Sequence, residues 1–195
     1  MIFNAIFTNL LNNTSKITPS IKTILLIIHR NMSYKLSCKC HKKDCIDNLE
    51  EYIIEHHAEA MVLTCIDYRF VDIMANFLER QPTLAYKFDL TALAGASLGY
   101  NQTKFEAWPA TFIDQVKLAI DLHHIRQLIV FDHMDCGAYQ LFYPDIESNS
   151  EEERLLHIKN IKLFIRQLRK LFPDLIYSGY LINVDATIDT IVKYK

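Results

Sequence analysis

Two stretches of the chain decide the fold: MVLTCIDYR at residues 61–69 and QLIVFDHMDCG at residues 127–137. Each contains consecutive apolar residues, the pattern of a strand that is buried on both faces of a parallel sheet. Each then continues, with no intervening linker, into cysteine, histidine, aspartate or arginine. The same two stretches therefore predict both the middle of a sheet and the place where functional side chains gather.

Helical and strand patterns alternate along the chain from residue 46 onward. Strands are expected at residues 61–64, 87–93, 127–131 and 175–184, and helices at 47–60, 71–79, 105–123 and 151–172. Such alternation is typical of an α/β fold in which right-handed crossovers place helices over a parallel sheet. We expect a mostly parallel, four-stranded core in the order 2-1-3-4, flanked by helices.

The composition is that of a globular chain in a reducing compartment. Half of the 195 residues are hydrophobic, which supplies a sizeable core, and the formal net charge of −2 gives no case for nucleic-acid binding. The apolar run at residues 24–28 is far shorter than the roughly 20 residues that span a bilayer. Five cysteines, an odd number, favour free thiols over a disulfide framework. We therefore expect a cytoplasmic protein with no nucleic-acid partner and no membrane partner.

The first 43 residues differ from the rest of the chain in charge. They contain seven Lys or Arg and no acidic residue, which leaves a net charge of −9 on the remainder. We expect residues 1–45 to form a leader or packing arm, or to precede a true start at Met32, and residues 46–195 to form the functional domain. An acid-free, hydroxyl-rich leader also allows organelle targeting as an alternative to the cytoplasm.

Cys65, His133 and Cys136 all lie just beyond the two apolar runs. In open α/β sheets, ligands bind outside the carboxyl ends of the strands, so neighbouring strands would bring these three side chains to one crevice. Two thiolates and one imidazole are a suitable set of zinc ligands and leave the fourth tetrahedral position open. A cysteine at a strand end is often only a small buried hydrophobic residue, but the two segments together point to a metal centre.

These motifs also resemble those of a known family. Cys65-x-Asp67-x-Arg69 followed by His133-x-x-Cys136-Gly137 resembles the metal-binding segments of the β-class carbonic anhydrases. Ala94-Gly95-Ala96-Ser97 is similar to that family's loop beside the metal, and residues 178–184 are similar to its late sheet strand. The resemblance spans residues 46–188, and the two metal-binding segments are its specific part.

The resemblance implies a β-carbonic anhydrase-like fold and a zinc lyase that reversibly hydrates carbon dioxide to bicarbonate. Cys65, His133 and Cys136 would bind Zn²⁺, and zinc-bound hydroxide would be the nucleophile. Asp67 would accept a hydrogen bond from the zinc-bound water, and Arg69 would keep Asp67 ionised and oriented. The family's dimers further imply a homodimer or a larger homo-oligomer.

Two alternatives for Asp67 and Arg69 stay open. The two residues could form a purely structural ion pair at a loop. The family also has a state in which this aspartate becomes the fourth zinc ligand and closes the site, and the sequence favours neither state.

The sequence departs from the family's pattern near the metal motifs. Tyr68 stands where a small residue is more usual, and Asp132 stands where glycine usually precedes the metal histidine. Asp132 and Asp135 place two extra carboxylates around His133, and either could orient its second ring nitrogen or face water. These departures keep two alternatives open: hydrolysis of carbon disulfide or carbonyl sulfide, and a zinc-binding protein without turnover.

Two other motifs suggest different chemistry. Residues 95–99, GASLG, match the G-x-S-x-G nucleophile elbow of serine hydrolases. Against that hypothesis, residues 100–103 do not predict a helix, and Cys65 and Cys136 would have no role. Cys38-x-Cys40-His41-x-x-x-Cys45 could form a structural zinc site or a redox-responsive loop.

Overall fold

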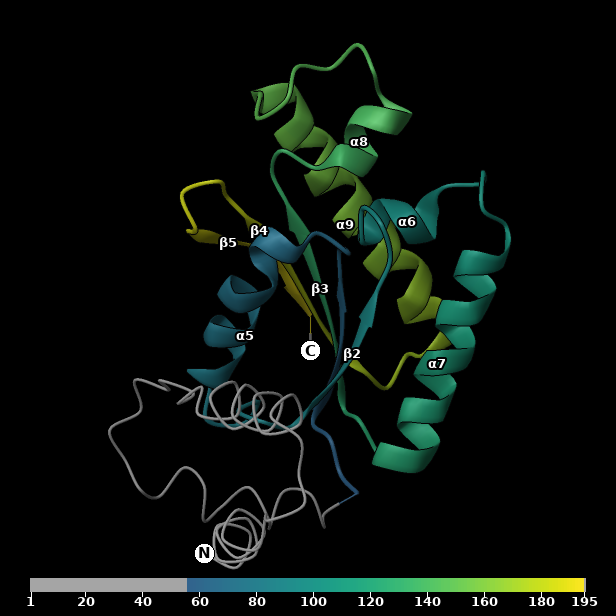
Figure 1. Cartoon of the computed structure of the whole chain (residues 1–195). Helices are drawn as coiled ribbons and strands as arrows, with labels where there is room; N and C mark the ends of the chain where they lie inside the picture. The colour runs from purple at the N-terminus through teal and green to yellow at the C-terminus, as the bar shows by residue number, and fades with distance from the viewer. Residues whose placement is uncertain (1–55, 195) are drawn as a thin grey trace, which may run out of the picture. The chain divides into compact units, whose positions relative to one another are not determined.

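A five-stranded sheet organises residues 56–194, the part of the chain that the computed structural model describes (Figure 1). The strands are β1 (Ala60–Thr64), β2 (Phe88–Ala92), β3 (Gln127–His133), β4 (Ile176–Ile182) and β5 (Ile188–Tyr194). Their order across the sheet is β2-β1-β3-β4-β5. The first four strands are parallel, and β5 pairs antiparallel with β4 at the edge.

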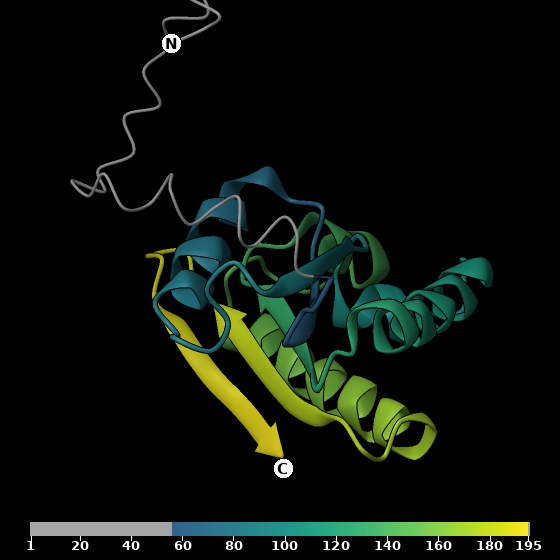
Figure 2. The ribbon, with the colours of Figure 1, turned by 90° about the horizontal axis from the view of Figure 1, so that it is seen from below.

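Helices cover both faces of this sheet. They are the 3₁₀ turn η1 (Tyr68–Phe70), α5 (Val71–Glu79), α6 (Ser97–Asn101), α7 (Ala107–His123), α8 (Gly137–Phe142) and α9 (Glu151–Leu171). Helix α5 packs on one face, and α6, α7 and α9 pack on the other (Figures 1 and 2). Helix α8 lies beyond the end at which the parallel strands finish (Figure 1).

The side chains of the central strands alternate between two cores. In β1, Ala60 and Val62 belong to the cluster on the α5 face, whereas Met61 and Leu63 belong to the cluster under α6, α7 and α9. Strand β3 alternates in the same way. Because helices cover both faces, these strands are apolar without a break, and this double burial supplies much of the driving force for folding.

The α/β class and the order 2-1-3-4 are confirmed for the four parallel strands. The strands and helices expected from residue 61 onward all form, with ends within two residues of the expected bounds. At the start of α9, the hydroxyl of Ser150 accepts a hydrogen bond from the backbone N–H of Glu153 and so caps the helix.

One helix boundary was wrong. A helix was expected over residues 47–60, of which 47–55 lie outside the described residues. Residues 56–59 are not helical, and Ala60 begins β1, where it pairs with Phe88 and Gln127. These two partners are far away in sequence, so local periodicity does not report the pairing.

Four elements were not expected from the sequence: the 3₁₀ turn η1, the helices α6 and α8, and the strand β5. The two helices have five and six residues, too few for a helical period to show. Strand β5 is a partly exposed edge strand of mixed polarity, IDTIVKY, and it is positioned by the hairpin in which the N–H of Asn183 donates to the carbonyl of Thr187 at 2.8 Å.

The leader expected at residues 1–45 lies outside the described residues, so its boundary with the domain stays a prediction. Within residues 56–194, none of the helices combines the length and the apolar character needed to cross a membrane.

Gly179 sets the distance between α9 and β4. A Cβ atom built on this residue would collide with the side chain of Ile161 and would lie 3.0 Å from Val192 Cγ1 and 3.1 Å from Ile165 Cδ1. The helix therefore approaches the strand more closely than any larger residue allows. This close approach holds α9, whose first turn reaches the segment that carries Cys136, against the sheet.

We predict that Gly179→Ala lowers the free energy of unfolding by about 1–3 kcal/mol, because the added methyl group overpacks a closed interface. Urea unfolding measures the change. Gly137→Ala is the matched control, since a Cβ there meets nothing within 4 Å, and it should leave stability unchanged or slightly higher. Equal stability of both variants would contradict this account of the interface.

Candidate metal centre

The carboxyl ends of β1 and β3 bring together the three expected metal ligands. Cys65 directly follows β1, His133 is the last residue of β3, and Cys136 is the N-cap of α8. One ligand atom from each lies within 4.8 Å of the other two, and all three residues are buried. Because β1 and β3 are hydrogen-bonded neighbours, the sheet itself creates this juxtaposition.

The two sulfur atoms have the separation that a shared tetrahedral ion requires. Cys65 Sγ and Cys136 Sγ lie 3.9 Å apart, and both cysteines are free thiols. Two zinc–sulfur bonds of about 2.3 Å in tetrahedral geometry place the sulfur atoms about 3.8 Å apart. The spacing of the two sulfur atoms therefore allows both to coordinate one ion.

His133 presents an unpartnered nitrogen beside these sulfurs. Its Nδ1 lies 2.9 Å from the carbonyl oxygen of Met134, which fixes this nitrogen as the donor. Its Nε2 is buried and has no hydrogen-bond partner among the described residues. The ring also stacks on Phe70, with centroids 4.1 Å apart. A held ring with a free lone pair is the arrangement expected of a metal ligand.

The pKa values of the two thiols shift in opposite directions. The hydrogen bond from Cys136 lowers the pKa of Cys65, and His133 and the N–H of Gly95, 3.2 Å from the sulfur, lower it further against the effect of burial. The neighbouring Cys65 and burial raise the pKa of Cys136. The site thus holds one thiolate readily, and a second negative charge requires a cation. This donor set fits a divalent metal ion.

Gly95 meets a backbone requirement in this site. Its φ of +79° lies in the left-handed region, and a Cβ would lie 3.1 Å from that of Ala138. Glycine adopts this conformation without steric cost. The residue can therefore turn its N–H toward Cys65 while α8 packs close by.

Asp67 and Arg69 form the expected pair at the rim of the site. Arg69 donates from Nε and Nη2 to the Asp67 carboxylate at 2.8–3.2 Å, and these hydrogen bonds lower the pKa of Asp67. Asp67 Oδ2 lies 3.9 Å from Nε2 of His133. The Asp67 carboxylate is thus adjacent to the three candidate ligands, and the hydrogen bonds from Arg69 fix its orientation.

Asp135 holds the other side of the same guanidinium, which the sequence did not indicate. Arg69 Nη1 donates to Asp135 Oδ2 at 2.8 Å, and Nη2 donates to the Asp135 carbonyl at 3.0 Å. Asp135 adopts a φ of +57°. Of the two alternatives for Asp132 and Asp135, neither carboxylate orients the His133 ring, because the Met134 carbonyl contacts its Nδ1 and both carboxylates have other partners.

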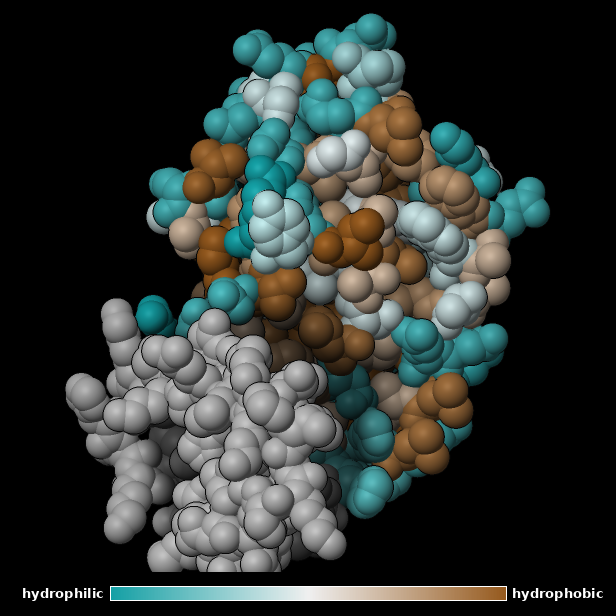
Figure 3. Space-filling view, in the orientation of Figure 1, coloured by the Kyte–Doolittle hydropathy of each residue, from teal (hydrophilic) through white to brown (hydrophobic). Residues whose placement is uncertain are grey.

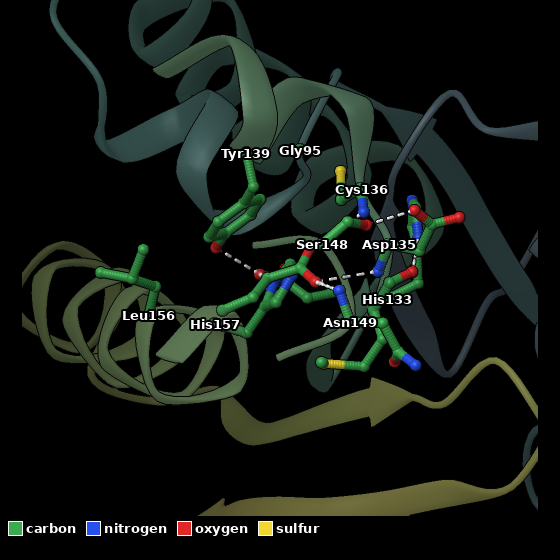
Figure 4. A network of polar contacts seen from close by, with 12 residues as sticks. Gly95, His133, Asp135, Cys136, Tyr139, Ser148, Asn149, Leu156 and His157 are labelled. Atoms are coloured by element: carbon green, nitrogen blue, oxygen red, sulfur yellow. Dashed lines mark hydrogen bonds and ion pairs between the residues drawn. The ribbon is translucent and has the colours of Figure 1, made fainter. Parts of the chain in front are cut away.

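Glu153 ties α9 to the segment that carries Asp135 and Cys136, both of which Figure 4 labels. Its carboxylate accepts the backbone N–H groups of Cys136 at 3.0 Å, Asp135 at 3.2 Å and Asn149 at 2.6 Å. The side chain is fully buried. In the sequence, Glu153 is only one of three acidic residues in a row. Its contact with the segment that carries Cys136 arises from the fold and leaves no local signal.

Asp132 lies at the centre of a buried network behind His133. Its carboxylate accepts hydrogen bonds from the N–H and hydroxyl of Ser97, from the hydroxyl of Tyr139 at 2.7 Å and from Nδ1 of His157 at 3.0 Å. His157 also pairs through Nε2 with Glu153 at 3.5 Å. The two buried carboxylates therefore flank one buried histidine, His157, which Figure 4 shows beside Tyr139.

The serine-hydrolase hypothesis fails on the same contacts. Helix α6 does begin at Ser97, so the expectation that no helix follows the serine was wrong. Ser97 is nevertheless fully buried, and its hydroxyl donates to Asp132 at 2.6 Å instead of to a histidine. The Ser97 hydroxyl therefore serves as a buried hydrogen-bond donor to Asp132 and is not placed as a nucleophile. The second cysteine cluster, at residues 38–45, lies outside the described residues.

An apolar pocket of about 470 Å³ opens beside Cys65 and the Asp67–Arg69 pair. Its walls come from Ile66 at one side and from Phe105, Trp108, Leu141 and Phe142 at the other. Brown, hydrophobic side chains accordingly gather on the face of the molecule seen in Figure 3. The site can therefore receive a small, weakly polar molecule.

The chain is similar to proteins of one family. Residues 55–192 match the family described as "Putative carbonic anhydrase". An uncharacterized protein of Rickettsia bellii is 31% identical over 139 residues, which cover 71% of this chain and 84% of that protein. An uncharacterized protein of Rickettsia conorii is 28% identical over 139 residues, which cover 71% of this chain and 74% of that protein.

The fold is similar to that of a solved β-carbonic anhydrase from the ascomycete Sordaria macrospora, which is described as tetrameric. The TM-score is 0.51 at 12% sequence identity, over 89% of this chain and all of that chain. At this identity the likeness shows the fold alone.

The buried histidine makes stability depend on pH. Burial alone would lower the pKa of His157, but Asp132 and Glu153 outweigh it and raise the pKa above the ordinary 6.5. A base whose pKa rises on folding stabilises the fold fully below its unfolded pKa, and this contribution fades as pH rises through the higher folded pKa.

We therefore predict that His157→Gln destabilises the fold most below about pH 6.5, and that its deficit against wild type shrinks as pH rises toward 9. Urea unfolding at several pH values measures this. The exposed His56→Gln should show no such trend. A deficit for His157→Gln that grows with pH would contradict the assignment of a cationic histidine.

Proposed function

The chain belongs to this carbonic anhydrase family, and we propose that it is a zinc lyase that reversibly hydrates carbon dioxide to bicarbonate. The observation that carries the proposal is the meeting of three buried donor atoms, from Cys65, His133 and Cys136, within 4.8 Å of one another. The Asp67–Arg69 pair and an apolar pocket lie at the same strand end. Metal, acceptor and substrate would thus meet in one place.

Cys65, His133 and Cys136 would hold Zn²⁺. The free Nε2 of His133 and the spacing of the two sulfur atoms support a divalent ion with soft ligands. Bound there, Zn²⁺ would supply the Lewis acidity that makes water a nucleophile near neutral pH. Three protein ligands leave the fourth position for the reactants.

Asp67 would orient the attacking water. The lowered pKa keeps its carboxylate ionised at neutral pH, so that it accepts a hydrogen bond from the water. Arg69 cannot lose its charge in this pH range, and its planar fork keeps the carboxylate aimed. Asp135 holds the opposite edge of the fork and so restrains Arg69 itself. We assign Asp67 as the acceptor and Arg69 as the residue that positions it.

The apolar pocket supports a small apolar substrate. Carbon dioxide carries no net dipole, and walls such as Phe105, Trp108 and Leu141 exclude competing water from its approach. Carbon disulfide and carbonyl sulfide are also small and weakly polar. Hydrolysis of either by the same residues is therefore the second candidate function.

We also propose a homodimer or larger homo-oligomer in the cytoplasm. Ile66 and Leu141, at the pocket, are 67% and 63% exposed, and a second subunit would cover such apolar side chains. The tetrameric state described for the Sordaria macrospora protein supports assembly. The free thiols of Cys65 and Cys136 support a reducing compartment.

Zinc content and hydration of carbon dioxide, measured together, test the function. We predict that Cys65→Ser loses both, because a ligand is missing. Asp67→Asn should keep its zinc and lose about 100-fold in rate, because an amide replaces the acceptor. The exposed Asp72→Asn on α5 is the control and should retain both.

Different failures of this experiment have different meanings. Full zinc binding in Cys65→Ser would remove the ligand assignment. Zinc-loaded wild type that hydrolyses carbon disulfide or carbonyl sulfide, but does not hydrate carbon dioxide, would favour the second candidate. A count of two zinc ions per chain would assign a second site to the Cys38–Cys45 cluster.

The contacts of Glu153 generate a further prediction. Glu153→Gln weakens the acceptor of three backbone N–H groups, so the segment carrying Cys136 is less well held. We expect zinc affinity to fall by about 10–100-fold, as is usual when the partner that orients a ligand is lost. Competition with a chromophoric chelator measures the affinity.

Glu152→Gln is the matched control, since Glu152 is the exposed neighbour on the same turn. It should leave zinc affinity unchanged. If Glu153→Gln bound zinc as tightly as wild type and lost only stability, its contacts would support the fold and not the ligand geometry.

A further inference from the structure

An open basic groove lies between the outer face of α9 and the end of β5. It has a volume of about 810 Å³. Five of its eight lining residues are cations: Lys159, Lys162, Arg166, Arg169 and Lys170. Figure 2 shows α9 running along the sheet on the side of β4 and β5. The groove uses the later turns of α9, whereas Glu153, which contacts the metal-binding segment, is in the first turn.

The groove is positively charged, whereas the part of the chain that carries it has a net negative charge. Residues 56–194 contain thirteen Lys or Arg and eighteen Asp or Glu, a net charge of −5. Five of those thirteen cations line this one hollow, and residues 155–173 contain no acid. Within the described part of the chain, none of the five forms an ion pair with a carboxylate. A basic hollow on a body of net negative charge attracts anions to this place.

Folding alone does not account for this charge pattern. Lys159 and Lys162 are three residues apart, and Lys162 and Arg166 four apart, so like charges face each other along the helix and destabilise it. A solvated helix face normally alternates the two signs. The helix dipole favours Arg169 and Lys170 in the last turn but does not reach the earlier cations. A pattern that costs stability without a folding benefit points to a ligand.

Strand β5 supplies an ordered wall. The guanidinium carbon of Arg169 lies 4.4 Å from the ring centroid of Tyr194, at the end of the strand. Stacking on the ring restrains the guanidinium and leaves its N–H edge free, the edge that binds oxyanions in a fork. Pro173 adds a rigid side beyond the end of α9. One donor of the groove is thus oriented before any ligand arrives.

We infer that this groove binds a chain of linked phosphates. The span from Lys159 to Lys170 is about 16 Å along the helix, so the five cations cannot converge on a single phosphate. An extended acidic peptide turns alternate side chains away and offers a charge only about every 7 Å on one side. Linked phosphates carry a negative charge at every unit, and their oxygens accept charge-assisted hydrogen bonds from Arg and Lys. The hollow shape also suits an inserted chain better than a flat bilayer.

Calorimetric titration of the full chain tests the inference. We expect inorganic tripolyphosphate to bind wild type more tightly than orthophosphate does, and to weaken as salt is added. Lys162→Gln/Arg166→Gln should weaken binding at least about tenfold, because two charged hydrogen-bond donors are lost. Arg80→Gln/Lys104→Gln removes the same charges at exposed sites outside the groove and should bind as wild type does.

Adenosine triphosphate, used as a second probe, identifies the source of the phosphates. Equal affinity for both probes would assign the site to the phosphate chain alone. Tighter binding of the nucleotide, lost in Tyr194→Leu, would assign it to a nucleoside triphosphate whose base uses the ring. No binding of either probe, or equal weakening in the control, would overturn the inference. Binding only to phosphatidylserine vesicles would also overturn it.

Discussion

The parallel pairing of β1 with β3 is the constraint on which the site depends. Val62 lies opposite Ile129 and Leu63 opposite Val130, so the two strands finish side by side. Cys65 and His133 lie at these two ends, and the short segment after β3 returns Cys136 to the same point. The site is therefore built on buried, doubly covered strands. Rigid elements of this kind hold ligands more accurately than loops do.

Buried charge surrounds this arrangement and gives it a specific shape. Asp132 and Glu153 are removed from water, which is costly unless each charge is paired and hydrogen-bonded. Backbone N–H groups, two hydroxyls and His157 supply those partners. The elements they join are β3, α6, α8 and α9, all of which border the segments that carry His133 and Cys136. Asp132, which directly precedes His133, thus connects the surrounding helices.

The sequence predicts the parts of the molecule that local patterns determine. Unbroken apolar runs give β1 and β3, and helical patterns give α5, α7 and α9. Cys65, His133 and Cys136 were found because chemically distinctive residues follow strand ends. The hold of Asp135 on Arg69 was not found, because it joins residues 66 positions apart.

Other features stay hidden from local patterns for related reasons. Strand β5 is half polar and gains its structure from the β4 edge. Glu153 has the sequence signature of an ordinary exposed capping-turn residue, and only tertiary packing buries it. The clustering of cations on α9 is visible in the sequence, but the groove that they line forms only when β5 is in place. Long-range contacts thus decide what the local pattern leaves undetermined.

With the proposed zinc site in place, Glu153 would link the folding of the domain to its metal supply. The carboxylate lies in the first turn of α9 and accepts backbone N–H groups of the segment that carries Cys136, so fraying of that turn would open the proposed site. By mass action, an ion that binds only the folded chain stabilises it by about 2.7 kcal/mol when its free concentration is a hundred times the dissociation constant. The population of folded molecules would then follow the free zinc concentration of the compartment, and scarcity of the ion would shorten the lifetime of the polypeptide.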